Sequence, residues 1–106
     1  MAGIPQRIPR VINLTASGGS ASTVVQFGGE VMGFSVIAPS GSAQWTISFD
    51  DEDGYPISKH SNMVGNCPVK DNFQIWFDKA RDKGVTVALS NSTDGAYKIK
   101  LWFRAA

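Results

Sequence analysis

Residues 85–104, VTVALSNSTDGAYKIKLWFR, decide the fold class of this chain. Apolar and polar side chains alternate over residues 85–90 and again over residues 97–104, and a period of two residues is typical of a β-strand with one buried face. The Asp94-Gly95 pair between them predicts a tight turn, because glycine accepts positive φ and aspartate tolerates turn geometry. We therefore predict an antiparallel hairpin over residues 85–104.

Short apolar blocks separated by turns continue back along the chain. Residues 43–49 alternate most clearly, and we expect Trp45, Ile47 and Phe49 to face the core. The sequence DDEDG at residues 50–54 predicts a second hairpin, because Gly54 can take positive φ. The eight predicted strands are residues 11–15, 23–27, 31–38, 43–49, 55–58, 72–77, 85–90 and 97–104. Between the fifth and sixth strands, we expect residues 59–71 to form a surface loop.

The composition agrees with one domain of β structure. The chain has 106 residues, of which 42% are hydrophobic and 18% charged, as is typical of a globular protein with a packed core. Its 11 glycines favour turns over long helices. No predicted helix is long enough to connect parallel strands. We predict that residues 11–106 form a single antiparallel β-sandwich or small barrel of jelly-roll or Greek-key type, with about seven to eight strands.

Residues 1–10 differ from the rest of the chain. They contain two prolines and the two arginines Arg7 and Arg10, with no helical period. Because proline fixes φ and removes a hydrogen-bond donor, we expect an extended N-terminal arm that lies across a neighbouring subunit. A frayed terminus is the alternative interpretation.

Charge and hydropathy exclude several classes of partner. Ten Lys and Arg residues against nine Asp and Glu residues give a formal charge of +1, so no overall field attracts nucleic acid, and we do not expect a nucleic-acid partner. No run approaches the ~20 apolar residues of a membrane span, and the N-terminal residues lack the apolar segment of a signal peptide. We therefore expect a soluble chain.

The sequence contains no recognisable catalytic or metal-binding motif. A Ser-His-Asp arrangement of Ser58, His60 and Asp71 can be assembled on paper, but no nucleophile elbow, phosphate loop or zinc motif accompanies it. We predict that the chain is not an enzyme and holds no cofactor. The acidic residues 50–53 lack the spacing of a calcium loop and are expected to form a solvated turn. The single cysteine, Cys67, is expected to be a structural thiol.

The tryptophans indicate the surface that binds a partner. Alternation places Trp76 opposite the apolar face of its strand, and places Trp102 on the face of three cations. Exposed aromatic residues beside positive charge are typical of interface anchors and of sugar-stacking platforms. Alternatively, a loop or the N-terminal arm covers them. The predicted partner-binding residues are Arg7, Arg10, Trp76, Lys98, Lys100, Trp102 and Arg104.

Three features carry a resemblance to a known class of proteins. They are the sequence GIPQRIPR at residues 3–10, the Ser- and Gly-rich loop at residues 16–22, and the short strands rich in Val, Ile and Thr. In this organisation the chain resembles the small β-sandwich accessory proteins of bacteriophage virions, such as decoration, cement and head-fibre-base proteins. The resemblance implies a capsid- or tail-associated structural protein of the virion, assembled in the host cytoplasm, whose partners are copies of itself and other virion proteins.

A carbohydrate-binding module is the second hypothesis. In that case Trp76 or Trp102 would stack on a sugar ring, Asp or Asn residues of the loops would bind its hydroxyl groups, and surface glycans would be the ligand.

Overall fold

The computed structural model describes residues 7–104, which form eleven β-strands and no helix. The strands are β1 (Arg7–Ala16), β2 (Ala21–Val24), β3 (Gly29–Ile37), β4 (Gln44–Asp50), β5 (Pro56–Val64), β6 (Cys67–Val69), β7 (Phe73–Ile75), β8 (Phe77–Asp78), β9 (Lys83–Gly84), β10 (Thr86–Ser90) and β11 (Gly95–Arg104). Within the described range, therefore, no helix is long and apolar enough to cross a membrane.

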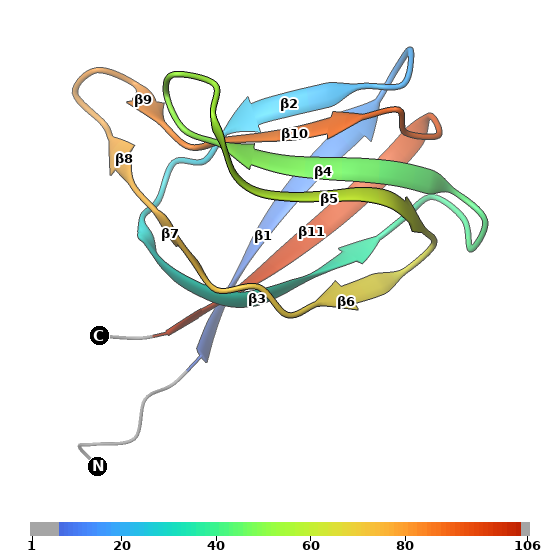
Figure 1. The fold of residues 1–106 in the computed structure, drawn as a ribbon, viewed down its shortest axis with the longest axis horizontal. Helices are drawn as coiled ribbons and strands as arrows, with labels where there is room; N and C mark the ends of the chain where they lie inside the picture. The colour runs from blue at the N-terminus through green and yellow to red at the C-terminus, as the bar shows by residue number, and fades with distance from the viewer. Residues whose placement is uncertain (1–6, 105–106) are drawn as a thin grey trace.

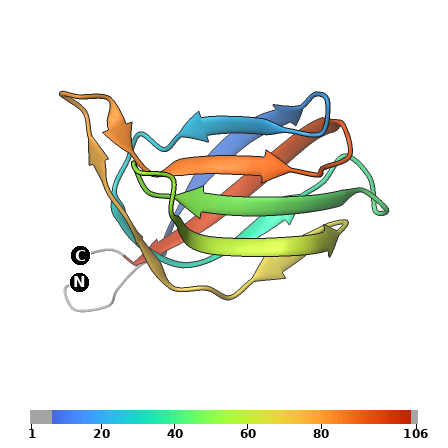
Figure 2. The ribbon, with the colours of Figure 1, turned by 45° about the horizontal axis from the view of Figure 1, so that its top comes forward.

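Two antiparallel sheets form the body of the molecule (Figure 1). The first, which we call the β11 sheet, has the strand order β1-β11-β3-β6, and β7 also pairs with β3. The second, the β4 sheet, has the order β2-β10-β4-β5, and its four strands lie side by side in Figure 2. A small hairpin of β8 and β9 extends from one end of the molecule.

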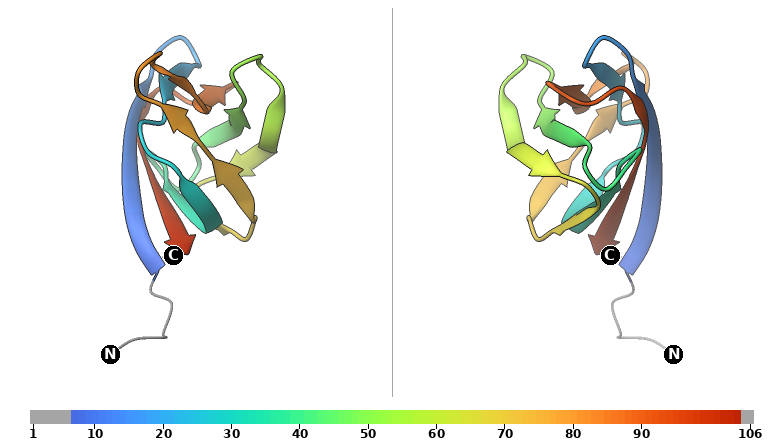
Figure 3. Two further views of the ribbon diagram at one scale, coloured as in Figure 1. Left: turned by 90° about the vertical axis from the view of Figure 1, so that its left-hand side faces the viewer. Right: turned by 90° about the vertical axis from the view of Figure 1, so that its right-hand side faces the viewer.

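Most consecutive strands lie in different sheets. The chain changes sheet between β1 and β2, β2 and β3, β3 and β4, β5 and β6, and β10 and β11. This winding, with sheets ordered β1-β11-β3-β6 and β2-β10-β4-β5, is that of a double-sheet jelly roll. Views from the two ends of the molecule show the two sheets on opposite sides of one core (Figure 3). The predicted all-β sandwich is confirmed.

The core is filled from the inward faces of both sheets, as the alternation predicts. Trp45, Ile47 and Phe49 of β4 have no exposed surface, and the indole Nε1 of Trp45 donates a hydrogen bond to the Gly65 carbonyl at 2.8 Å. From β11, the alternate residues Tyr97, Ile99, Leu101 and Phe103 are buried in the same cluster.

The hairpin predicted at residues 50–54 is confirmed. The carboxylate of Asp51 accepts hydrogen bonds from the backbone N–H groups of Asp53 and Tyr55, both at 2.9 Å, and Gly54 has a φ of 87°. The turn joins β4 to β5, which pair in the β4 sheet.

The hairpin predicted over residues 85–104 is wrong. Both strands exist, but β10 pairs with β2 and β4, whereas β11 pairs with β1 and β3 in the other sheet. Residues 91–95 are a corner that crosses between the sheets. Its residues bond to distant parts of the chain. The Thr93 N–H donates to the Gln44 carbonyl, and the Gln44 N–H donates to the Thr93 hydroxyl. The Asp94 carboxylate accepts a hydrogen bond from the Gly19 N–H.

Tyr97 closes this corner. Its hydroxyl donates to the Thr93 carbonyl at 2.7 Å, four residues upstream, in the manner of the tyrosine corners of other β-sandwiches. Burial raises the pKa of the Tyr97 hydroxyl, so the group stays a neutral donor across physiological pH. Gly95, the last residue of the corner, has a φ of 139°, and a Cβ atom at this position would lie 2.7 Å from the Pro39 ring.

Residues 59–71 are not the predicted loop. They hold most of β5 and all of β6. The strand count is eleven instead of the predicted seven to eight, because β6 and β9 are additional and the predicted strand over residues 72–77 is divided into β7 and β8. β5 is an edge strand with a bulge, because Ser61 and Asn62 together oppose Thr46, and Asn62 has a φ of 59°. The bulge interrupts the alternation on which the sequence-based prediction depended.

The predicted arm at residues 1–10 also needs correction. Residues 7–10 belong to β1, whose pairing with β11 begins at Arg7, opposite Arg104. The domain boundary expected at residue 10 therefore falls inside a strand. Proline does not prevent this, because β1 is at the edge of its sheet, where a strand can lack a donor on its open side. Residues 1–6 of the predicted arm lie outside the described residues.

We predict that Tyr97→Phe lowers the free energy of unfolding by about 1 kcal/mol, because it removes the hydroxyl that holds the sheet-crossing corner. Urea denaturation of the variant and the parent measures the difference. Tyr55→Phe is the matched control, since Tyr55 is 72% exposed. Equal stabilities of the two variants would contradict the role of the corner.

Candidate functional site

The outer surface of the β11 sheet carries most of the predicted partner-binding residues. Lys98, Lys100, Trp102 and Arg104 alternate with the buried residues of β11 and point away from the core. The Nζ atom of Lys100 lies 4.7 Å from the centre of the Trp102 ring, a cation–π contact that orients both side chains. We call this surface the basic face.

Apolar side chains lie between the cations of the basic face. Val11 of β1 is opposite Lys100 and is 45% exposed, and Ile37 of β3 is opposite Lys98 and is 50% exposed. The basic face thus combines apolar area with positive charge. That combination is typical of surfaces that bind proteins.

A groove of about 170 Å³ runs beside Trp102. Trp102 is opposite Gly33 of β3, which also lines the groove, and a Cβ atom at Gly33 would lie only 3.0 Å from the Val69 carbonyl oxygen. Met32, Ser35, Pro68 and Lys70 also line the groove, so its lining combines apolar side chains with one hydroxyl group and one cation.

The other predicted residues lie elsewhere. Trp76 lies between β7 and β8, outside the strands of the β11 sheet; it is 42% exposed and does not line the groove beside Trp102. Arg10 is opposite the buried Leu101, and its guanidinium lies 5.4 Å from the centre of the Phe27 ring, so it is not part of the basic face. Of Arg7, only the backbone position opposite Arg104 is described.

The structure does bring Ser58, His60 and Asp71 together. The Ser58 hydroxyl donates to the Oδ2 atom of Asp71, and Nε2 of His60 lies 2.9 Å from the same oxygen and 3.3 Å from Ser58 Oγ. The His60 ring also packs against Phe34 of the core, with the two ring centres 5.5 Å apart in an edge-to-face arrangement. The three side chains join β5 to the segment between β6 and β7, and so fasten one sheet to the other.

This cluster lacks the geometry of a catalytic triad. In a triad the carboxylate and the serine bind opposite nitrogens of the imidazole, so that one nitrogen can accept the serine proton. Here the carboxylate and the serine contact the same nitrogen, which as a donor to Asp71 cannot also accept a proton from Ser58. Ser58 is moreover only 6% exposed. The cluster is therefore a structural clamp.

The clamp perturbs the titration of Asp71. Partial burial raises the pKa of this carboxyl group, but the hydrogen bonds from Ser58 and His60 and the charge of His60 favour the ionised form more strongly. As a result the pKa of Asp71 lies below its ordinary value of 3.8.

Within residues 7–104, no three potential ligands among His, Cys, Asp and Glu converge as a metal site would require. In the turn that follows β4, the carboxylate of Asp51 accepts hydrogen bonds from the backbone N–H groups of Asp53 and Tyr55. Glu52 and Asp53 are exposed.

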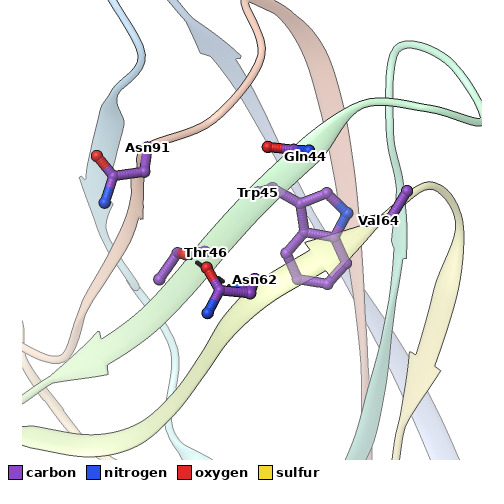
Figure 4. Close-up of a pocket in the computed structure, with 6 residues that line it drawn as sticks. All are labelled: Gln44, Trp45, Thr46, Asn62, Val64 and Asn91. Atoms are coloured by element: carbon purple, nitrogen blue, oxygen red, sulfur yellow. Dashed lines mark hydrogen bonds between the residues drawn. The ribbon is translucent and has the colours of Figure 1, made fainter.

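A feature that the sequence analysis missed is a pocket of about 330 Å³ on the β4 sheet (Figure 4). Its polar side chains come from three separate segments: Gln44 and Thr46 from β4, Asn62 from the bulge of β5, and Asn91 from the end of β10. We call it the amide pocket. No sequence signal joins these residues, because only the pairing of β4 with β5 and β10 makes them neighbours.

No protein-family model, curated protein or solved structure matches this chain.

We predict that Asp71→Asn lowers the free energy of unfolding by about 1 kcal/mol at pH 7. A carboxyl group whose pKa is depressed by folding stabilises the protein fully above its unfolded pKa, and this contribution is lost as the pH falls through the folded pKa. The difference in free energy of unfolding between the parent and Asp71→Asn should therefore shrink below about pH 4. Urea denaturation at a series of pH values measures it.

The control for this measurement is Asp53→Asn, in an exposed part of the β4–β5 turn. The free energy of unfolding of this variant should differ little from that of the parent, and the difference should be nearly independent of pH. A stability gap for Asp71→Asn that persists unchanged at pH 2 would contradict the clamp.

Proposed function

We propose that the chain is a structural subunit that assembles with copies of itself, through contact between the basic face of one copy and an acidic region of the next. The observation that carries this proposal is the separation of charge. Residues 50–53 and 78–83 contain six of the nine acidic residues but only three of the ten basic ones, a net charge of −3. The rest of the chain carries a net charge of +4.

The acidic residues lie at one end of the molecule. The β4–β5 turn and the β8–β9 hairpin are neighbours there (Figure 1). A hollow at this end is lined by Glu52, Asp82 and Lys83. Arg81 binds the carboxylate of Asp78 at 2.7 Å, which neutralises part of the charge. The carboxylates of Glu52 and Asp53 are exposed and available to a partner. We call Glu52, Asp53 and the adjacent Tyr55 the acidic tip.

The acidic tip and the basic face are complementary in two respects. Glu52 and Asp53 match the charge of Lys98 and Lys100, and complementary charge raises the rate and specificity of association. Tyr55 offers an aromatic ring that could enter the groove beside Trp102, and buried aromatic anchors contribute much of the energy of interfaces.

A contact between two different surfaces repeats from copy to copy. Such head-to-tail contacts generate a closed ring or an extended array, depending on the rotation between neighbours. Either form suits a virion protein that caps or lines a repeating surface. The jelly roll is also a fold of viral capsid domains, which supports a bacteriophage virion as the proposed setting by analogy of fold.

The central prediction is that charge reversal on either surface weakens self-association and that mixing the two variants restores it. Lys98→Glu with Lys100→Glu reverses the basic face, and Glu52→Lys with Asp53→Lys reverses the acidic tip. Each double variant alone should lose about tenfold or more in association constant, because like charges then face each other. Sedimentation velocity at micromolar concentration measures association, and added salt should weaken it in the parent.

The matched control is Lys59→Glu, which reverses one exposed charge on β5, outside the basic face. It should leave association unchanged. A parent chain that sediments only as a monomer would overturn the proposal. So would a mixture of the two double variants that associates no better than either one alone.

A further inference from the structure

The amide pocket has a volume and a lining suited to a small polar ligand. Its volume of about 330 Å³ lies at the lower end of the range of small-molecule sites, which begins near 300 Å³. Figure 4 shows Thr46 and Asn62 side by side, Asn91 to their left, Gln44 above the Trp45 ring, and Val64 to the right of that ring. None of the six lining residues is charged.

The hydrogen-bonding groups of the pocket are available to a ligand. Each of the side-chain amides of Gln44, Asn62 and Asn91 offers two N–H donors and one carbonyl acceptor. Within the described residues, none of these three amides makes a side-chain hydrogen bond to the protein. The Thr46 hydroxyl accepts the backbone N–H of Asn62 at 3.3 Å and keeps its own proton free to donate.

The positions of these groups are set by the backbone. Asn62 and Asn91 have φ values of 59° and 47°, the left-handed conformation that asparagine tolerates better than most residues. Gln44 is fixed at its backbone by two hydrogen bonds with Thr93, at 2.8 Å and 3.1 Å. Trp45 is held beneath the pocket by its bond to the Gly65 carbonyl. The backbone from which each amide projects is therefore fixed, and within residues 7–104 the amides have no bond to the protein that a ligand would have to break.

We propose that the amide pocket binds one neutral sugar unit. A sugar ring carries several hydroxyl groups that both donate and accept, which matches uncharged amides and a hydroxyl better than it matches ions. The exposed Val64 offers apolar area to the C–H face of the ring. The site is separate from Trp76 and Trp102, and it does not depend on the assembly contact.

Ligand-observed saturation-transfer NMR tests the proposal with neutral monosaccharides, their methyl glycosides, and short neutral oligosaccharides as probes. For a ligand of this size we expect a Kd on the order of 1 mM. Equal affinity for a methyl glycoside and an oligosaccharide ending in the same sugar assigns the site to a terminal glycan residue. Tighter binding of the free monosaccharide assigns it to a free sugar. A charged sugar such as glucuronic acid should bind more weakly than the neutral monosaccharides.

Asn62→Gly and Asn91→Gly remove the two amides while keeping the backbone, because glycine accepts positive φ without strain. Together they should weaken sugar binding about tenfold or more. Gln44→Ala is a further variant at a position without positive φ, and it should also weaken binding. Asn13→Ala is the matched control, since this exposed asparagine lies on β1, in the other sheet.

Two results would overturn the inference: no saturable binding of any neutral sugar, or binding that survives the loss of both asparagines. Sugar binding that is lost in Trp102→Ala but retained without the asparagines would also overturn it, and would assign the sugar to the tryptophan instead. Sedimentation of the asparagine variants separates this site from the assembly contact, because self-association should not change in them.

Discussion

The burial of one side of β11 is the constraint on which the rest of the structure depends. This strand is hydrogen-bonded on both sides, to β1 and to β3, and its Tyr97, Ile99 and Leu101 lie in one core with the inward residues of β4. Burying such side chains contributes about 1.5–3 kcal/mol each. Because successive side chains of a strand point to opposite faces, the same burial places Lys98, Lys100 and Trp102 on the outside. The basic face is thus a consequence of the core.

The corner at residues 91–95 determines how the two sheets are joined. Its bonds to Gly19 and Gln44 link segments 49 to 75 residues apart in the sequence. Tyr97 holds the corner from the core side, and Asn91 leaves β10 in a left-handed conformation that also contributes an amide to the pocket. One corner therefore connects the stability of the sandwich with the geometry of a candidate binding site.

The cluster of Ser58, His60 and Asp71 shows that residue types alone do not determine what a cluster does. The three residue types are those of a hydrolase, yet the carboxylate and the serine contact one imidazole nitrogen, and the result is a clamp between sheets. The amide pocket is the opposite case, because its residue types do not indicate a site and its geometry does. Gln44, Asn62 and Asn91 are ordinary surface residues in the sequence, and only the bulge of β5 and the end of β10 bring their amides around one cavity.

The sequence by itself determined the β class, the inward faces of β4 and β11, and the turn at residues 50–54, because alternation and turn chemistry are local properties. Only the tertiary structure decided which strands pair. An alternating strand, an Asp-Gly turn and a second alternating strand describe a hairpin and a sheet-crossing corner equally well. Residues 85–104 form the corner because β4 and β2 bind β10 while β1 and β3 bind β11, and those partners are distant in the sequence. The clamp, the basic face with its groove, and the amide pocket depend on the same long-range pairing.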